Sequence, residues 1–536
     1  MKKLTCIILL FVASTLFAAT PRAGEKLAKE QSFTFNAEAA PQSLDPAKIE
    51  GVPEGVFARN LFETLIISDE NDKLAPGVAL TWNHSDDYKT WTFNLRKNAK
   101  WSNGDNVTAK DFVFAWKRLA DPKTASPYAS YLTYLKLQNA DEIVKGKLSP
   151  DKLGVEAKDD YTLVLHLEDS VPFADLLTQF YVLSPVPQKV VEKLGDAWSD
   201  PKNLVSNGAF KLDSFVVNEE AKLSKNPYYW DAKNVLLDKL TLLQIQNQSV
   251  AFTRYRANAL DISTFPLELL DKVKKEYPKE FTTGSNLCTY YFQFNVANPP
   301  FDNVKVRQAL SMALDRNIIT DKILRQGQIP AFNFSPPAIS AAELITPPEW
   351  SKWDDKKRHE EAIKLLNEAG YNKNHPLIFT LLYNTSEEHK KLAIAASSIW
   401  KQNLGGIVNI KLQNQEWKTF LSTRRLGQHQ MARAGWCSDY NEASSFLNIF
   451  LSNSSNNHSR FKNTQYDETI KQAYKAKNEE ERAKLYAKAE EILATEVPLA
   501  PAFNQSQTFL IKPYVKGFKI KPSRSYYFKD VYILEH

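Results

Sequence analysis

Several residue types and motifs are scarce in this chain of 536 residues, and each shortage excludes a class of protein. Seventeen glycines are too few for glycine-rich nucleotide loops or repeat arrays. The sequence has no Gly-x-Ser-x-Gly elbow, no His-Glu-x-x-His helix and no phosphate-binding loop. The histidines show no metal-ligand spacing. We therefore expect a protein that is not an enzyme and that needs no metal or cofactor.

Neither sign of charge dominates the chain. It has 68 Lys and Arg against 62 Asp and Glu, a formal charge of +6, and no block of basic residues. Interspersed charge of this kind indicates a solvated surface, so we expect no nucleic-acid partner. With 43% hydrophobic and 24% charged residues, the composition is that of a globular protein, and the length predicts two or three domains.

Long apolar runs are absent beyond the first 20 residues. The chain opens MKKLTCIILLFVASTLFAAT, with a basic start, an apolar stretch over residues 4–17 and small residues at Ala18 and Ala19. These features predict a secretory signal peptide over residues 1–19. The alternative, a membrane anchor, needs a longer span and a stop-transfer pattern. We expect an exported, soluble and unlipidated protein.

Cysteine is rare. Removal of Cys6 with the signal peptide leaves only Cys288 and Cys437. Two thiols in an oxidising compartment predict one disulfide, and two are too few for a structural zinc site.

The residues that are present predict alternating helices and strands. Apolar periodicity and capping residues predict helices over 354–370 and 478–493. Alternation predicts strands over 91–96, 161–167, 288–295 and 376–384. The prolines fall in short connectors, and no long flexible linker separates the domains. We expect an α/β protein whose domains are interleaved along the chain.

The segment RAGWCSDYNE at 433–442 places a cation and an anion beside an aromatic residue. One interpretation is structural: Asp439 caps a helix formed by the following residues, Arg433 makes a surface ion pair, and Trp436 is core. The other is functional, because the disulfide would hold the segment rigid and a second aromatic-basic segment lies at 415–425. A fixed Arg, Trp and Asp are what a zwitterionic ligand needs.

Nine segments resemble the periplasmic oligopeptide-binding proteins that serve ABC importers, and the resemblance covers the mature chain. They are SLDPAKIEGVPEG (43–55), WTFNLRKNAKWSNGDNVTAKDFVFAW (91–116), SPYASYL (126–132), NPYYWDAK (226–233), LCTYYF (287–292), VRQALSMALDR (306–316), LLYNTSEEHKKLAIAASS (381–398), NQEWKTF (414–420) and RAGWCSDYNE. Three positions depart from the family: Asn106 and Ala443 stand where proline is common, and Phe503 lies in a strand that is often tyrosine-rich.

The resemblance implies a bilobed α/β fold with an extra third domain. A hinge of crossing strands would join the lobes, and the ligand would be enclosed between them. The implied division is lobe I over 20–62, 187–287 and 505–536, the extra domain over 63–186, and lobe III over 288–504.

The resemblance also implies the site. Asp439 matches the acid that pairs with a peptide's α-ammonium, and Cys288 and Cys437 match the family's disulfide. The other matching positions are Gly435 and Cys437 on the strand that pairs with the peptide backbone; Glu50, Gly51 and Val52 from the other lobe; Arg433, Arg424 and His389 for the carboxylate; and Tyr128, Tyr291, Trp417 and Trp436 as pocket walls.

The implied function is that of a periplasmic receptor for short peptides, acting as a monomer and delivering them to an ABC permease. Within the same fold, the alternatives are a specialised receptor for a murein tripeptide or for haem. Outside that function, the alternatives are an exported peptidase, which would hydrolyse a bound peptide, and a periplasmic chaperone, which would bind long unfolded chains as well.

Overall fold

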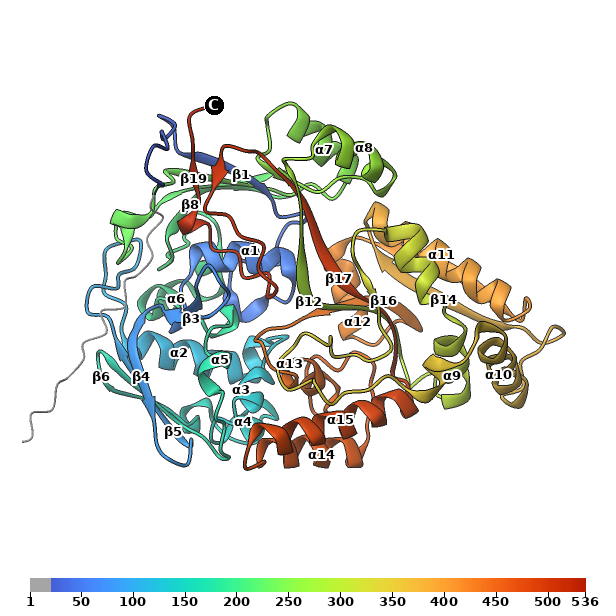
Figure 1. Ribbon diagram of the computed structural model, residues 1–536. Helices are drawn as coiled ribbons and strands as arrows, with labels where there is room; N and C mark the ends of the chain where they lie inside the picture. Colours follow the sequence, from blue (N-terminus) through green and yellow to red (C-terminus); the bar gives the residue numbers. More distant parts are fainter. Residues whose placement is uncertain (1–20) are drawn as a thin grey trace, which may run out of the picture.

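One large mixed sheet runs through the molecule in the computed structural model, which describes residues 21–536 (Figure 1). The order of the path is β15-β14-β16-β12-β17-β11-β1-β10-β9-β8, and β13 also pairs with β17. Its strands are β1 (Ser32–Asn36), β8 (Phe210–Val216), β9 (Glu220–Lys225), β10 (Lys239–Leu243), β11 (Ile262–Ser263), β12 (Phe281–Phe294), β13 (Ile329–Pro330), β14 (Leu377–Asn384), β15 (Val408–Gln415), β16 (Met431–Cys437) and β17 (Leu499–Ile511).

The strands β12 and β17 hold the two halves of this sheet together. They are the longest strands of the described residues, with 14 and 13 residues, and they pair antiparallel. In the sheet order, β14, β15 and β16 lie on one side of them, and β1 and β8 to β11 lie on the other. Figure 1 shows the pair crossing the middle of the molecule. The α/β fold is therefore bilobed, with two strands shared between the lobes.

The pairing of β12 with β17 is irregular at two places, one between Ser285 and Thr289 and one between Tyr290 and Tyr291. Ser285 pairs with Ser506, but the register shifts before Thr289, which pairs with Asn504. The first irregularity coincides with the boundary expected between residues 287 and 288 and between 504 and 505. The observation supports the division into lobes, which stays a prediction.

A smaller antiparallel sheet lies within residues 63–186, the expected extra domain. Its order is β4-β5-β7-β6. The strands of this sheet are β4 (Ala79–His84), β5 (Thr90–Leu95), β6 (Val155–Asp159) and β7 (Thr162–His166). Two further sheets have two strands each: β2 (Ile66–Ser68) with β3 (Leu74–Pro76), and β18 (Val515–Lys516) with β19 (Tyr532–Ile533). The predicted strands over 91–96 and 161–167 are confirmed as β5 and β7.

Fifteen α-helices occur in the described range. They are α1 (Val52–Leu61), α2 (Ala109–Ala120), α3 (Tyr131–Tyr134), α4 (Ala140–Val144), α5 (Ala174–Leu177), α6 (Gln188–Leu194), α7 (Gln248–Arg256), α8 (Leu270–Glu276), α9 (Val304–Ala313), α10 (Asp355–Glu368), α11 (Glu387–Asn403), α12 (Trp417–Arg425), α13 (Ser444–Leu447), α14 (Thr464–Tyr474) and α15 (Glu479–Glu496). No helix within residues 21–536 has the length and apolar character that crossing a bilayer requires.

Local sequence explains the predicted helices. The helix expected over 354–370 is α10, and the chain turns at Gly370, whose φ of +90° suits glycine. The helix expected over 478–493 is α15, and the Asn478 side chain accepts a hydrogen bond from the Glu481 backbone N–H at 2.9 Å. Both predictions are confirmed.

The strand predicted over 288–295 is longer than its apolar pattern. It begins at Phe281, because the polar residues before Asn286 pair with β17 through their main chain while their side chains are mostly exposed. The strand predicted over 376–384 is confirmed as β14. The signal peptide predicted over 1–19 lies outside the described residues.

Candidate functional site

A cavity of about 330 Å³ lies between the lobes. All thirteen residues that the sequence predicts for the site line it: Glu50, Gly51, Val52, Tyr128, Tyr291, His389, Trp417, Arg424, Arg433, Gly435, Trp436, Cys437 and Asp439. They come from α1 and the segment before it, from β12, from β16 and the loop after it, from α11 and α12, and from the loop before α3. Residues that are hundreds of positions apart therefore face one enclosed space.

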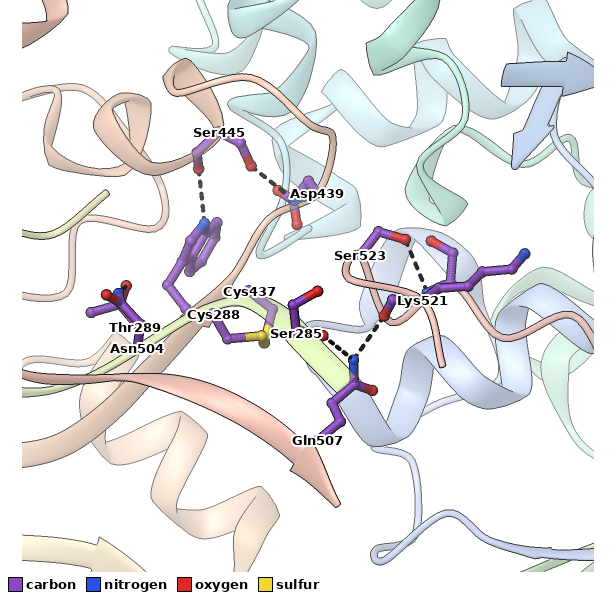
Figure 2. Close-up of a disulfide and its surroundings, with 12 residues drawn as sticks. Ser285, Cys288, Thr289, Cys437, Asp439, Ser445, Asn504, Gln507, Lys521 and Ser523 are labelled. Carbon is purple, nitrogen blue, oxygen red and sulfur yellow. Dashed lines mark hydrogen bonds between the residues drawn. A yellow bond between two sulfur atoms is a disulfide. The ribbon is translucent and has the colours of Figure 1, made fainter. Parts of the chain in front are cut away.

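The disulfide between Cys288 and Cys437 is confirmed. The two cysteines are direct partners in the β12–β16 ladder, so the bond joins neighbouring strands at the end of β16. Figure 2 shows that Asp439 lies on the loop just beyond this bond. The covalent link limits the movement of the loop that carries the acid.

One edge of β16 is open toward the cavity. β12 pairs with β16 along residues 431–437, whereas β14 pairs only with Met431 and Ala432. Beyond Ala432, the second edge of β16 has no strand partner among residues 21–536. Gly435 lies on this stretch, and a side chain there would come within 3.2 Å of Gln505. An extended ligand could add to this edge as a further strand.

Asp439 brings a carboxyl group to the lining of the cavity. The Tyr128 hydroxyl donates a hydrogen bond to Asp439 Oδ1 at 3.4 Å. The Asp439 backbone N–H donates to Ser445 Oγ at 2.8 Å and so fixes the loop (Figure 2). Burial raises the pKa of the Asp439 carboxyl well above its usual range, and the charge of Arg59 opposes that rise. A cation beside the carboxylate would relieve this cost.

The capping interpretation of Asp439 is wrong. The helix that follows, α13, begins at Ser444, and its N-cap residue is Ala443. The core interpretation of Trp436 is only partly right, because the half-buried ring packs on core residues and also lines the cavity. Its indole N–H donates to the Ser445 carbonyl at 2.8 Å, which holds the ring in place. The surface interpretation of Arg433 is also wrong, because it lines the cavity and makes none of the salt bridges found among residues 21–536.

Arg433 provides a positive charge in the same cavity. Its Nη2 contacts the His389 ring, and its guanidinium lies 5.3 Å from the centre of the Tyr290 ring. The Nε atom is buried and has no hydrogen-bond partner. Burial, together with the charge of Arg433, lowers the pKa of His389 well below its usual range, so the imidazole is neutral. An incoming anion would find an unused donor on Arg433.

Arg424 is a second cation in the cavity. Its Nε and Nη2 donate to Gln293 Oε1 at 3.2 and 3.1 Å, and no carboxylate pairs with it among the described residues. The neighbouring Arg425, by contrast, pairs with Glu50 at 2.9 Å. The two arginines therefore have different partners, and Arg424 keeps a charge available to an anionic ligand.

The segment from Glu50 to Val52 meets α12 across the cavity. Burial raises the pKa of Glu50 to about 7, and Arg425 opposes this shift. The Trp417 indole N–H donates to Glu54 Oε1 at 3.1 Å. A Cβ atom at Gly51 would lie 2.5 Å from Glu54 Oε2 and 2.9 Å from the Trp417 ring. Glycine therefore permits the close approach of the two lobes.

The sequence interpretation missed several residues of the cavity. They include Arg59, Phe180, Tyr181, Tyr290, Glu388 and Arg524. Arg59 lies two turns after Val52 on α1, and Glu388 directly precedes His389, so spacing could have indicated both. Tyr290 adjoins Tyr291 in the sequence, and its ring stacks on Phe503 at 4.8 Å. Arg524 carries no such local signal. No group of side chains suited to a metal ion occurs within residues 21–536.

Two lobes that share crossing strands and enclose a cavity with opposite charges define a bilobed solute-binding protein of the periplasmic class. The chain belongs to the bacterial extracellular solute-binding proteins, family 5, whose middle region matches residues 73–458. It is 50% identical over 516 residues to the periplasmic oligopeptide-binding protein OppA of Haemophilus influenzae, covering 96% of this chain and 95% of that protein. The name of this relative is that of a binding protein.

Solved structures of relatives differ in how closely the arrangement of their lobes matches that of this chain. The complex of Haemophilus influenzae OppA with the peptide RPPGFSPFR superposes with a TM-score of 0.94 at 51% identity, over 95% of this chain and 100% of that one. The murein tripeptide-binding protein MppA in its unliganded open form gives 0.67 at 42% identity, over 96% and 99%. The present structure therefore has the arrangement of the peptide-bound relative.

Proposed function

We propose that this protein is an exported receptor that binds short peptides by their backbone and charged ends and delivers them to an ABC permease. The open edge of β16 beyond Ala432 is the observation that carries the proposal, because backbone pairing ignores side chains. Asp439 would hold the ammonium, and Arg433, Arg424 and His389 would hold the carboxylate at different peptide lengths. Segment 50–52 would contact the peptide from the other lobe.

The aromatic residues and the lobes complete the proposal. Tyr128, Tyr291, Trp417 and Trp436 would form the walls of the side-chain pockets, where bridging water allows broad specificity. We further propose that lobe I comprises 20–62, 187–287 and 505–536, the extra domain 63–186, and lobe III 288–504. The irregular pairing at Ser285–Thr289 supports this hinge position. A periplasmic location, reached with the signal peptide over 1–19, agrees with the name of the relative from Haemophilus influenzae.

The experiment is native mass spectrometry of the purified monomer, with release and sequencing of what co-purifies. A ladder of mixed short peptides supports the proposal and gives the range of lengths. A single recurring mass, such as a murein fragment or haem, would instead identify a specialised receptor of the same fold.

The proposal that the protein is not an enzyme has its own test. A bound peptide should be recovered intact after many hours with the protein. Cleavage products would indicate a peptidase, and equally tight binding of long unfolded proteins would indicate a chaperone.

A further inference from the structure

The second irregularity in the pairing of β12 with β17 lies in the wall of the cavity. Tyr290 pairs with Phe503. The next residue, Tyr291, pairs with Pro501, which leaves Ala502 as an extra residue of β17, a β-bulge. Successive side chains of a strand point to opposite faces, so without the bulge Ala502 would lie beside Tyr290 and Phe503 would point the other way. The bulge therefore puts the Phe503 ring against Tyr290.

The pair of rings that results supports two residues of the proposed carboxylate site. The rings of Tyr290 and Phe503 stack with their centres 4.8 Å apart and their planes at 13°, and both residues line the cavity. The Arg433 guanidinium lies 5.3 Å from the centre of the Tyr290 ring, and the centre of the His389 ring lies 5.8 Å from it. A guanidinium that rests on an aromatic ring moves when the ring moves. The bulge therefore affects the position of Arg433.

A buried arginine outside the cavity lining holds the bulge. Arg316 is 1% exposed, and its Nε donates to the Pro501 carbonyl at 2.9 Å and to the Ala331 carbonyl at 2.7 Å. The Ala331 N–H in turn donates to the Ala502 carbonyl at 3.1 Å. Arg316 thus fixes the extra residue through Ala331, and it fixes the residue before it directly.

The rest of the guanidinium is held on its other sides. Nη1 of Arg316 donates to the carbonyls of Ser311 at 3.0 Å and Leu314 at 3.1 Å, at the C-terminal end of α9, where the helix dipole favours a cation. The rings of Phe332 and Trp350 have their centres 4.6 and 5.3 Å from the guanidinium carbon. A side chain bound in this way has little freedom, so its Nε–H stays directed at the bulge.

We propose that Arg316 is a positioning residue of the binding site. By bonding the bulge, it keeps the Phe503 ring against Tyr290. The stacked rings in turn keep Arg433 in place for the carboxylate of a ligand. This inference rests on the proposed function, and it gives a role to the segment VRQALSMALDR (306–316), which lies outside the cavity lining.

The variant Arg316→Lys removes the donor that reaches the bulge. Lysine has a methylene group where arginine has Nε, while its ammonium group can still donate to the carbonyls at the end of α9. Arg307→Lys is the matched control. Arg307 belongs to the same segment and is 5% exposed, and its Nε donates to the carbonyls of Glu496 and Val497, both at 3.0 Å. These carbonyls precede β17, so the control removes an equivalent donor away from the bulge.

The assay measures how strongly binding depends on the ligand carboxylate. Dialanine, trialanine and tetraalanine, each as the free acid and as the C-terminal amide, are titrated calorimetrically into the ligand-free protein. Arg433→Gln identifies the peptide length whose carboxylate Arg433 binds, because the ratio of acid to amide affinity falls toward one at that length. There we expect Arg316→Lys to lower the ratio about tenfold, less than the complete loss of a desolvated charge pair, and to leave the amide affinity unchanged. Arg307→Lys should keep the wild-type ratio.

A further variant tests whether Arg316 acts through the Phe503 ring. Phe503→Ala should lower the same ratio, and adding Arg316→Lys to it should lower the ratio no further, because both changes remove one support. Circular dichroism checks that each variant is folded. Independent, additive losses in the double variant would overturn the route through Phe503.

The outcomes separate the inference from the function on which it rests. A wild-type ratio in folded Arg316→Lys overturns the inference and leaves peptide binding intact, and so does an equal fall in Arg307→Lys or an equal loss of acid and amide affinity. If Arg316→Lys does not fold, Phe503→Ala decides alone, and an unchanged ratio there overturns the inference. An unchanged ratio in Arg433→Gln at every length overturns the role of Arg433 and the inference with it. Failure of wild type to bind any of these peptides overturns the proposed function.

Discussion

Replacement of Asp439 by asparagine tests the centre of the proposed site. The two side chains have the same shape, so Tyr128 can still donate to the side-chain oxygen, and the backbone N–H can still bind Ser445. What is lost is the charge that would neutralise a peptide ammonium in a site with little water. Breaking such a desolvated pair costs about 2–5 kcal/mol. The affinity should therefore fall by about 30-fold to 5000-fold.

The assay is calorimetric titration of trialanine into ligand-free wild type and Asp439→Asn. A second peptide, N-acetyl-trialanine, lacks the ammonium and completes a double-mutant cycle. Wild type should lose affinity for the acetylated peptide, and the variant should bind both peptides about equally. Circular dichroism checks that the variant is folded. The same affinity of wild type and folded variant for trialanine would refute the role of Asp439.

Asp439→Asn should weaken peptide binding, but it should raise the stability of the ligand-free protein. The pKa of Asp439 is raised in the folded protein, so the folded state binds more protons than the unfolded state between the two pKa values. Its contribution to the free energy of unfolding therefore falls as the pH rises through that interval. Asp439→Asn removes this penalty, so the ligand-free variant should have a higher melting temperature than wild type at pH 7. A lower melting temperature would contradict the raised pKa.

Three further predictions concern the disulfide and the contact between the lobes. Double replacement of Cys288 and Cys437 by serine should lower the free energy of unfolding by about 2–5 kcal/mol, measured by urea denaturation; a change below about 0.5 kcal/mol would contradict this. Gly51→Ala should cost about 1–3 kcal/mol of peptide binding, because the added methyl group overlaps Glu54; unchanged affinity would show that the lobes can shift. The pKa of Glu50 is raised to about 7, so its contribution to stability should increase as the pH falls from about 8 toward the unfolded pKa near 4.3; Glu50→Gln should flatten this dependence of melting temperature on pH, and a parallel profile would exclude Glu50 as its source.

Local patterns predicted the elements well where one residue dominates the local energetics. Asn478 marked the start of α15, and Gly370 marked the end of α10, because capping and positive φ act within a few residues. The same reasoning failed at Asp439. The residues after it do form a short helix, but that helix begins only at Ser444, and Asp439 instead faces the cavity.

The sequence alone determined which residues we propose for peptide recognition. The rarity of cysteine left one possible pair, and the segment RAGWCSDYNE carried an acid, a cation and an aromatic residue within a short stretch. The family resemblance added the partners from the other lobe. These conclusions depend on residue type and order, which are properties of the chain before it folds.

Only the tertiary structure decided how these residues act together. Tyr128 and Asp439 are 311 positions apart, and their hydrogen bond exists only because the folded chain brings the loop before α3 against the loop after β16. Whether the second edge of β16 is open depends on where β14 stops pairing with it. The raised pKa of Asp439 depends on how much water the closed lobes exclude from the buried carboxyl group. Desolvation and strand pairing arise from the whole packed molecule, so no local pattern in the sequence encodes them.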